Sequence, residues 1–146
     1  MSDFYLSVGD AVTFSKTVSE TDVYLFAGIT GDLAPVHVNE ALMNKSAFGQ
    51  RIAHGALLVG FMSTLSTMMV AQAKDSHSKG ETPVALGYDK IRFTAPVFFG
   101  DTVTLTYTIT DVDTERRRTT ANIEAKNQND ITVAVAVGLL KWVKRD

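Results

Sequence analysis

The sequence predicts an α+β domain in which a curved antiparallel sheet wraps around one long central helix. Its 146 residues suffice for a single domain with its own core. No Lys, Arg, Asp or Glu occurs between Arg51 and Lys74, which indicates one long apolar helix. The second half alternates apolar and polar residues between turn-forming residues, a pattern typical of hairpin-linked strands with one apolar face. That apolar face needs a cover, and the apolar helix is the element that can provide it.

The first half of the chain reads mainly as helices and loops. Val12 to Val18 alternates apolar and polar residues and predicts a strand. Ser19 with Asp22 three residues later resembles a capping box, which starts a helix that ends near Gly28 or Gly31. The remaining elements of this half are a loop containing Pro35, a short polar helix at about 39–46 and the apolar helix at roughly 55–73.

The second half of the chain reads as strands rich in Thr, Val and Ile, preceded by a polar connector at 75–81. The predicted strands lie at about 84–94, 102–112, 119–127 and 131–144. The turns between them are expected at 99–101, 113–115 and 127–130, and the last of these is a strong hairpin signal. No internal repeat and no second domain are indicated, so residues 1–146 are expected to form one domain.

The apolar helix is long enough on paper to cross a bilayer, so a membrane span has to be weighed. It carries Gly60, Ser63, Thr64 and Gln72, however, and as a lone span it would leave the strands that follow without a core. We therefore predict a core helix and a soluble protein. The start of the chain lacks the basic and apolar regions of a signal peptide, which favours a cytoplasmic location.

Composition excludes several classes of function. The chain has no cysteine, which excludes disulfides, cysteine-ligated metals and thiol nucleophiles. A net charge of −2 argues against nucleic acid as a partner. The three histidines form no metal-ligand motif, so neither metal nor cofactor is expected, and His77 is expected to be solvated in its polar connector. Arg116, Arg117 and Arg118 lie near acidic residues and are expected to form a solvated hairpin, with contact to the phosphate groups of a ligand as the alternative.

The chemistry is concentrated between Gly31 and Gly55. Asp32 precedes His37 by five residues, which on a continuous helix would place the two side chains about 140° apart. Pro35 disfavours helical geometry at the preceding residue, so a bend could let the carboxylate and the imidazole converge. Such a pair can bind a water molecule and exchange protons with it near neutral pH. The alternative is that Asp32 closes the preceding helix and His37 caps the next one.

A second feature is His54-Gly55, directly before the long apolar helix. The first N–H groups of a helix have no partner within it, and the helix dipole adds positive charge there. Glycine lets a ligand approach the backbone closely. A helix start of this kind could stabilise the enolate oxygen of a thioester, although on its own it is equally a plain helix terminus.

Three ordered segments resemble the MaoC-like (R)-specific enoyl-CoA hydratases, also called hydratase type 2. Residues 24–37, ending in TGDLAPVH, are similar to the family pattern S/T-G-D-x-N-P-x-H. Residues 47–55, AFGQRIAHG, resemble the family's stretch that ends in H-G. Residues 92–101, RFTAPVFFGD, resemble its F-x-x-P-V-x-x-G-D turn. Together the segments occur in the expected order over nearly the whole chain.

The resemblance implies a hot-dog fold and a homodimer that binds an acyl-CoA thioester where the subunits meet. It assigns Asp32 and His37 to the activation of water and the Gly55 N–H to the thioester oxygen. Substrate contacts are implied for a further set of residues, namely Gly31, Ala34, Pro35, His54 and Ser63. A helix carbonyl could equally satisfy the Ser63 hydroxyl.

One position departs from the family pattern, because Ala34 stands where the family has Asn. An amide there could hydrogen-bond the catalytic loop, and alanine cannot. Because Asp32 and His37 are both present, the sequence still predicts reversible hydration of trans-2-enoyl-CoA to (R)-3-hydroxyacyl-CoA. A thioesterase or a non-catalytic protein that binds acyl thioesters is the alternative.

Overall fold

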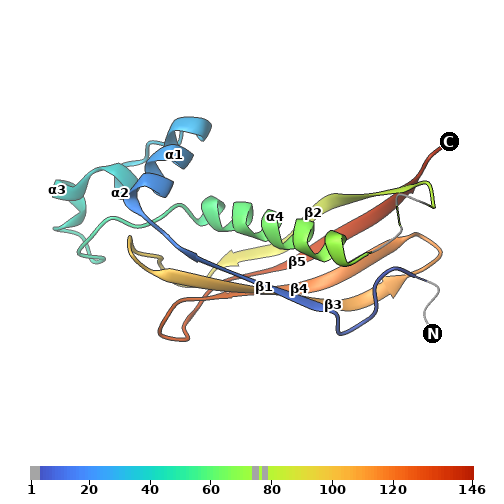
Figure 1. Cartoon of the computed structure of the whole chain (residues 1–146). Helices are drawn as coiled ribbons and strands as arrows, with labels where there is room; N and C mark the ends of the chain where they lie inside the picture. Colours follow the sequence, from blue (N-terminus) through green and yellow to red (C-terminus); the bar gives the residue numbers. More distant parts are fainter. Residues whose placement is uncertain (1–3, 74–75, 77–78) are drawn as a thin grey trace.

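A five-stranded antiparallel sheet curves around one helix, α4, in the computed structural model (Figure 1), which describes residues 4–73, 76 and 79–146. The elements are, in chain order, β1 (Ala11–Thr17), α1 (Glu20–Thr30), α2 (Pro35–Val38), α3 (Glu40–Met43), α4 (Gly55–Gln72), β2 (Glu81–Phe93), β3 (Thr102–Asp113), β4 (Arg118–Lys126) and β5 (Thr132–Lys144). The predicted α+β class and the sheet around a central helix are confirmed. His77 and part of the predicted connector lie outside the described residues.

The strands are ordered β1-β3-β4-β5-β2, and every neighbouring pair is antiparallel. Hairpins join β3 to β4 and β4 to β5, as predicted. The predicted turn at 99–101 is present, with the Asp101 N–H donating to the Phe98 carbonyl at 3.0 Å. It does not join neighbouring strands as a hairpin, because β2 pairs with β5 at one edge of the sheet. The chain from 94 to 101 therefore crosses to the far side of the sheet, and Ile52 forms an isolated bridge with Phe98 along the way.

Helix α4 supplies one side of the core. Its side chains Leu58, Met62, Leu65 and Met69 are buried against the concave face of the sheet. By length and composition alone α4 could cross a membrane, with a mean hydropathy of 1.4. Because one of its faces packs on the sheet, α4 is the core helix that the sequence predicted.

The short helices α2 and α3 lie with α1 beyond the first turn of α4, at one end of the molecule (Figure 1). The sequence predicted a loop at Pro35 and then a polar helix at 39–46; the structure has a helical turn, α2, in the first of these ranges and a shorter helix, α3, in the second. Asn39 divides them, because it adopts extended geometry and its side chain accepts a hydrogen bond from the Leu42 N–H at 3.0 Å. Asparagine is a favoured N-cap, so α3 starts anew at this residue.

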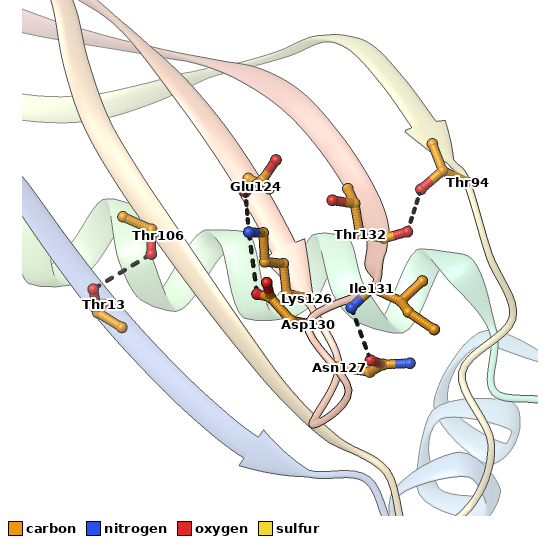
Figure 2. Close-up of polar contacts among 9 residues, drawn as sticks. All are labelled: Thr13, Thr94, Thr106, Glu124, Lys126, Asn127, Asp130, Ile131 and Thr132. Carbon is orange, nitrogen blue, oxygen red and sulfur yellow. Dashed lines mark hydrogen bonds and ion pairs between the residues drawn. The ribbon is translucent and has the colours of Figure 1, made fainter.

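The chain after β2 is fixed to the sheet at the end where β4 turns into β5. The Thr94 hydroxyl donates to the carbonyl oxygen of Thr132 at 2.8 Å, and the Thr94 N–H donates to the Val133 carbonyl at 2.9 Å. Figure 2 shows the Thr94 side-chain contact beside the β4–β5 turn, where the Asn127 carboxamide oxygen accepts from the Ile131 N–H at 3.1 Å. These bonds position the segment that follows Phe93.

A buried ion pair fixes the opposite end of the sheet. Glu81 is only 4% exposed and accepts two hydrogen bonds from the Arg117 guanidinium, while the Tyr5 hydroxyl donates to it at 2.7 Å. Arg117 also lies over the rings of Phe4 and Tyr5, at 4.7 and 5.5 Å from their centroids. The hydrogen bonds from Arg117 hold the pKa of Glu81 below its ordinary value, against the opposing effect of burial.

The ion pair predicts an acid-sensitive component of stability. A carboxylate with a lowered folded-state pKa stabilises the fold above the unfolded-state pKa, and this contribution disappears as the pH falls through the folded-state value. Glu81→Gln should lower the free energy of unfolding by about 2 kcal/mol at pH 7, because Arg117 loses its charged partner. The deficit relative to the wild type should shrink below about pH 4. Urea denaturation between pH 3 and 7, run as a series, measures both effects.

Glu124→Gln is the matched control, because Glu124 is half-exposed and reaches Lys126 at only 3.6 Å. It should change stability by less than about 0.5 kcal/mol at every pH. An equal loss in both variants would contradict a special role for the buried pair.

Candidate active site

Asp32 lies in a turn directly after the end of α1. The predicted capping box is present at the start of α1, and Gly31 ends the helix in the left-handed conformation with φ 79°. A glycine is favoured there because it has no Cβ to clash. The Asp32 N–H then donates to the Thr30 hydroxyl at 3.2 Å, and the Asp32 carboxylate accepts from the Ala34 N–H at 3.3 Å. The exposed carboxylate is thus held in a defined turn.

Helix α2 delivers His37. Pro35 is its first residue, where a missing N–H costs nothing, and Ala34 before it is extended at φ −56° and ψ 139°. The predicted bend between Asp32 and His37 is therefore present. His37 is 8% exposed, and its Nδ1 lies 2.7 Å from the carbonyl oxygen of Ile52. A carbonyl can only accept, so Nδ1 carries the hydrogen and Nε2 is left with a free lone pair.

These contacts contradict the interpretation in which Asp32 and His37 only cap helices. Backbone bonds close α1, with the Gly31 N–H donating to the Ala27 carbonyl at 2.8 Å. His37 lies inside α2 and its side chain is directed to a carbonyl fifteen residues away. The second carboxylate oxygen of Asp32 and the His37 Nε2 make no hydrogen bond with another residue in the described part of the chain.

His54 connects the two segments. Its ring is 2% exposed and lies between Phe26 and His37, with centroid separations of 4.8 and 3.7 Å. Its Nε2 donates to the backbone carbonyl of Asp32 at 2.8 Å, which fixes the tautomer. The other ring nitrogen, Nδ1, is buried without a hydrogen-bond partner in the described part of the chain. A single side chain therefore positions both the Asp32 turn and the His37 ring.

The three polar side chains converge. One carboxylate oxygen of Asp32 and one ring nitrogen each of His37 and His54 all lie within 4.8 Å of one another. A water molecule between the carboxylate and an imidazole could hydrogen-bond both groups at this spacing. The spacing is also compatible with a divalent metal ion. The sequence motif favours an acid–base role for these groups.

A cavity of about 390 Å³ opens beside these residues, at the start of α4. His37, His54 and Gly55 line it together with mostly apolar residues. Gly55 is the first residue of α4, and its N–H makes no hydrogen bond with another described residue. A Cβ at position 55 would lie 2.5 Å from the ring of Phe93, so only glycine fits without moving that ring.

The remaining predicted substrate contacts are placed differently. Gly31, Ala34 and Pro35 form the turn that carries Asp32 and His37, and they do not line the cavity. Ser63 is exposed on α4, two turns beyond Gly55, and lies outside the cavity of this chain. The roles of these four residues stay predictions.

Several cavity residues were not predicted as site residues. They are Phe48, Ile52, Ala53, Leu58, Phe93 and the segment 94–97. Apolar linings carry no chemical signature, so the sequence offered only two signals, both from the family resemblance. These are the AFGQRIAHG segment, which contains Phe48, Ile52 and Ala53, and the RFTAPV segment, in which Pro96 follows a predicted strand. The latter segment belongs to the site because it crosses the end of the sheet.

Comparison with known proteins identifies the family. The model of the MaoC like domain matches residues 5–132. The chain therefore belongs to the MaoC-like domain family.

Named relatives and a solved structure agree with that class. An (R)-specific enoyl-CoA hydratase of Rhodospirillum rubrum is 41% identical over 66% of this chain and 60% of its own length. A 3-hydroxybutyryl-CoA dehydratase of Methylorubrum extorquens is 36% identical over 67% of this chain and 57% of its own. The chain thus spans about three fifths of these two curated relatives. The structure of an (R)-hydratase from A. caviae involved in PHA biosynthesis matches with a TM-score of 0.78 and 26% identity, over 93% of this chain and 96% of that one. The fold is the hot-dog fold that the sequence resemblance implied.

The departure from the family pattern at Ala34 has a structural consequence. Ala34 is the N-cap of α2, the helix that carries His37, and makes no side-chain cap. Ala34→Asn should supply the missing acceptor and raise the free energy of unfolding by about 0.5–1 kcal/mol. Urea denaturation measures the change, and Ala34→Val, which offers no oxygen, is the control. Equal stability of the two variants would contradict the capping role.

The close contact between Gly55 and Phe93 predicts a coupled pair. Gly55→Ala should lower stability by about 1–3 kcal/mol, because the new methyl group collides with the Phe93 ring. In a Phe93→Ala background the same change should cost at least ~1 kcal/mol less. Gly28→Ala is the control, because position 28 lies inside helix α1 with nothing within 4 Å, and it should stabilise by about 0.5–1 kcal/mol. Additive effects of Gly55→Ala and Phe93→Ala would show that the collision is not the cause.

Proposed function

We propose that this protein reversibly hydrates trans-2-enoyl-CoA thioesters to (R)-3-hydroxyacyl-CoA. The observation that carries the proposal is the convergence of Asp32 and His37 beside an apolar cavity that begins at the free N–H of Gly55. An apolar acyl chain, a water-activating pair and an oxyanion donor are the three components that hydration of an enoyl thioester requires. The relatives named as hydratase and dehydratase support the same reaction class.

Asp32 and His37 bind the water molecule and transfer its protons. Because Nδ1 of His37 donates to the Ile52 carbonyl, Nε2 can accept a proton or a hydrogen bond from water. The Asp32 carboxylate accepts from the same water on its other side. The hydroxyl adds to C3 of the substrate, and one proton returns through the pair to C2. In the reverse direction the same groups remove the C2 proton and release water.

The start of α4 stabilises the charge that develops. While C3 is attacked, the electron pair of the double bond moves through C2 onto the thioester oxygen. The Gly55 N–H at the positive end of an 18-residue helix donates to that oxygen. Phe93 occupies the space beside Gly55 and restricts how the thioester approaches.

A homodimer is part of the proposal. Strand β2 is a 13-residue edge strand with exposed apolar side chains, Val84, Leu86 and Phe93 among them. The other edge strand, β1, has seven residues, and its outer face bears hydroxyl groups that bond to β3. The exposed face of α4 carries small residues, namely Ala56, Gly60, Ser63, Thr67 and Ala71, which would let a second helix approach closely. A second copy that pairs along β2 would cover both features.

Turnover assays separate hydration from the alternative, a thioesterase or a binding protein. Crotonyl-CoA is mixed with the protein, and loss of the enoyl absorbance is followed beside release of free thiol. Loss of absorbance without thiol is the result expected of a hydratase. Thiol release would support a thioesterase in which Asp32 directs water to the carbonyl, and neither signal would support a binding protein.

The acid–base pair predicts non-additive losses. Asp32→Asn keeps the size of the side chain but removes the proton acceptor, so turnover of crotonyl-CoA should fall by at least about 10²-fold. His37→Ala should fall comparably, and the double variant should lose little more, because the two residues act as one unit. Thermal melting serves as the control for folding. Additive losses, or normal turnover in either single variant, would remove the pair from the mechanism.

A further inference from the structure

Positive charge gathers at the end of the sheet that lies away from the cavity. Half of the chain's 14 lysines and arginines occur in three short segments that meet there, namely Lys79, Arg116, Arg117, Arg118, Lys141, Lys144 and Arg145. The chain as a whole carries a net charge of −2, so this is a strong local asymmetry. A hollow of about 730 Å³ is lined there by the tip of the β3–β4 hairpin and the last residues of β5. We call its Arg116, Arg118, Lys141 and Lys144 the basic cluster.

Two members of the basic cluster face each other without a counterion. Arg118 on β4 and Lys141 on β5 are direct register partners, and like charges directly opposite each other destabilise a sheet. Neither makes an ion pair with a described carboxylate. Asp113 is the register partner of Arg118 on β3, but its ion pair is with Arg116 at 3.8 Å, and Glu81 pairs with Arg117. Glu115 is the remaining carboxylate of the hollow. A bound anion of high charge would relieve this repulsion.

Figure 1 shows the β3–β4 hairpin and the end of β5 at the end of α4 that lies away from α1 and α2. These two segments carry the basic cluster, whereas the cavity opens at the start of α4. The 18 residues of α4 separate them by about 27 Å along the helix. Strand β2 runs between the same two ends of the molecule. Its first residue, Glu81, pairs with Arg117, and its last residue, Phe93, lines the cavity. If two chains pair antiparallel along β2, the Glu81 end of one chain meets the Phe93 end of the other.

We propose that the basic cluster of one subunit binds the phosphate groups of the coenzyme A thioester whose acyl group occupies the cavity of the partner subunit. The inference rests on the proposed function, because it takes the acyl-CoA substrate and the β2-paired dimer from there. Coenzyme A carries a diphosphate and a 3′-phosphate, and the pantetheine arm separates them from the thioester. Guanidinium and ammonium groups are the usual ligands of such phosphates. Each complete site would then contain residues of both chains.

A pair of thioesters tests the proposal by activity. Crotonyl-CoA and crotonyl-pantetheine carry the same acyl group and thioester, and the second has no phosphate. In the Arg118→Gln/Lys141→Gln variant, the ratio of kcat/KM for crotonyl-CoA to that for crotonyl-pantetheine should fall about tenfold or more. The control variant Lys16→Gln/Lys126→Gln removes two lysines elsewhere that are 39% exposed, and it should leave this ratio unchanged. An unchanged ratio in the first variant would overturn the proposal.

Mixed dimers test whether the cluster acts across the interface. One chain carries Asp32→Asn with an intact basic cluster, and the other carries Arg118→Gln/Lys141→Gln with an intact Asp32, each with a different affinity tag. The functional Asp32 then faces the intact cluster of its partner, so the mixed dimer should show the wild-type KM for crotonyl-CoA at about half the wild-type kcat. A raised KM would show that the cluster acts on its own chain's cavity, and a protein that sediments only as a monomer would also overturn the proposal.

Direct binding keeps this inference separable from the proposed function. Adenosine 3′,5′-bisphosphate, titrated calorimetrically, should bind the wild type at least about tenfold more tightly than the Arg118→Gln/Lys141→Gln variant. This measurement needs no catalysis, so the anion site can be confirmed even if no enoyl thioester is hydrated. Inorganic pyrophosphate is the second probe, and if it binds as tightly as the nucleotide, the site is a general anion site and the coenzyme A assignment fails. Equal binding of the nucleotide by both proteins would also overturn it.

Discussion

The hydrogen bond from Nε2 of His54 to the backbone carbonyl of Asp32 joins the two chain segments on which the site depends. One segment is the turn between α1 and α2, which carries the carboxylate, and the other is the approach to α4, which carries the free N–H of Gly55. The same imidazole stacks on His37 at 3.7 Å, while His37 is tied by its Nδ1 to Ile52 in the second segment. Each of the two segments thus contributes one histidine that hydrogen-bonds a backbone carbonyl of the other. Neither loop has regular structure of its own, so these bonds define the positions of the polar groups.

The sheet and helix place this cross-linked pair at the start of α4. Burial of Leu58, Met62 and Leu65 against the concave face fixes where α4 begins, and its first turn therefore opens at one end of the sheet. The pairing of β2 with β5 forces the following chain to cross that same end, which adds an apolar wall to the cavity. The distant end is closed instead by Glu81, Arg117 and the aromatic rings of the N-terminal arm. The molecule therefore has a cavity at one end and a packed, positively charged surface at the other.

The difference between the two ends matters if two chains pair along β2. An antiparallel pair of edge strands places unlike ends of two chains side by side, so each cavity would gain a neighbouring surface that its own chain cannot supply. The small residues on the exposed face of α4 and the apolar residues on β2 are consistent with contact between two copies. A substrate with an apolar acyl end and a polyanionic end matches such a composite site, because the two parts need opposite environments.

The sequence by itself determined the fold class and the position of the candidate site residues along the chain. Alternation in the second half predicted the strands, the uncharged run predicted α4, and the capping box at Ser19 predicted the start of α1, because each depends on residues close together in the chain. The bend at Pro35 that brings Asp32 toward His37 was also predictable, since proline restricts the residue before it. Tertiary structure alone decided the order of the strands, the crossing of 94–101, the role of His54 as a link and the contact between Gly55 and Phe93. These features join residues far apart in sequence, and local propensity carries no information about which distant segments will pack together.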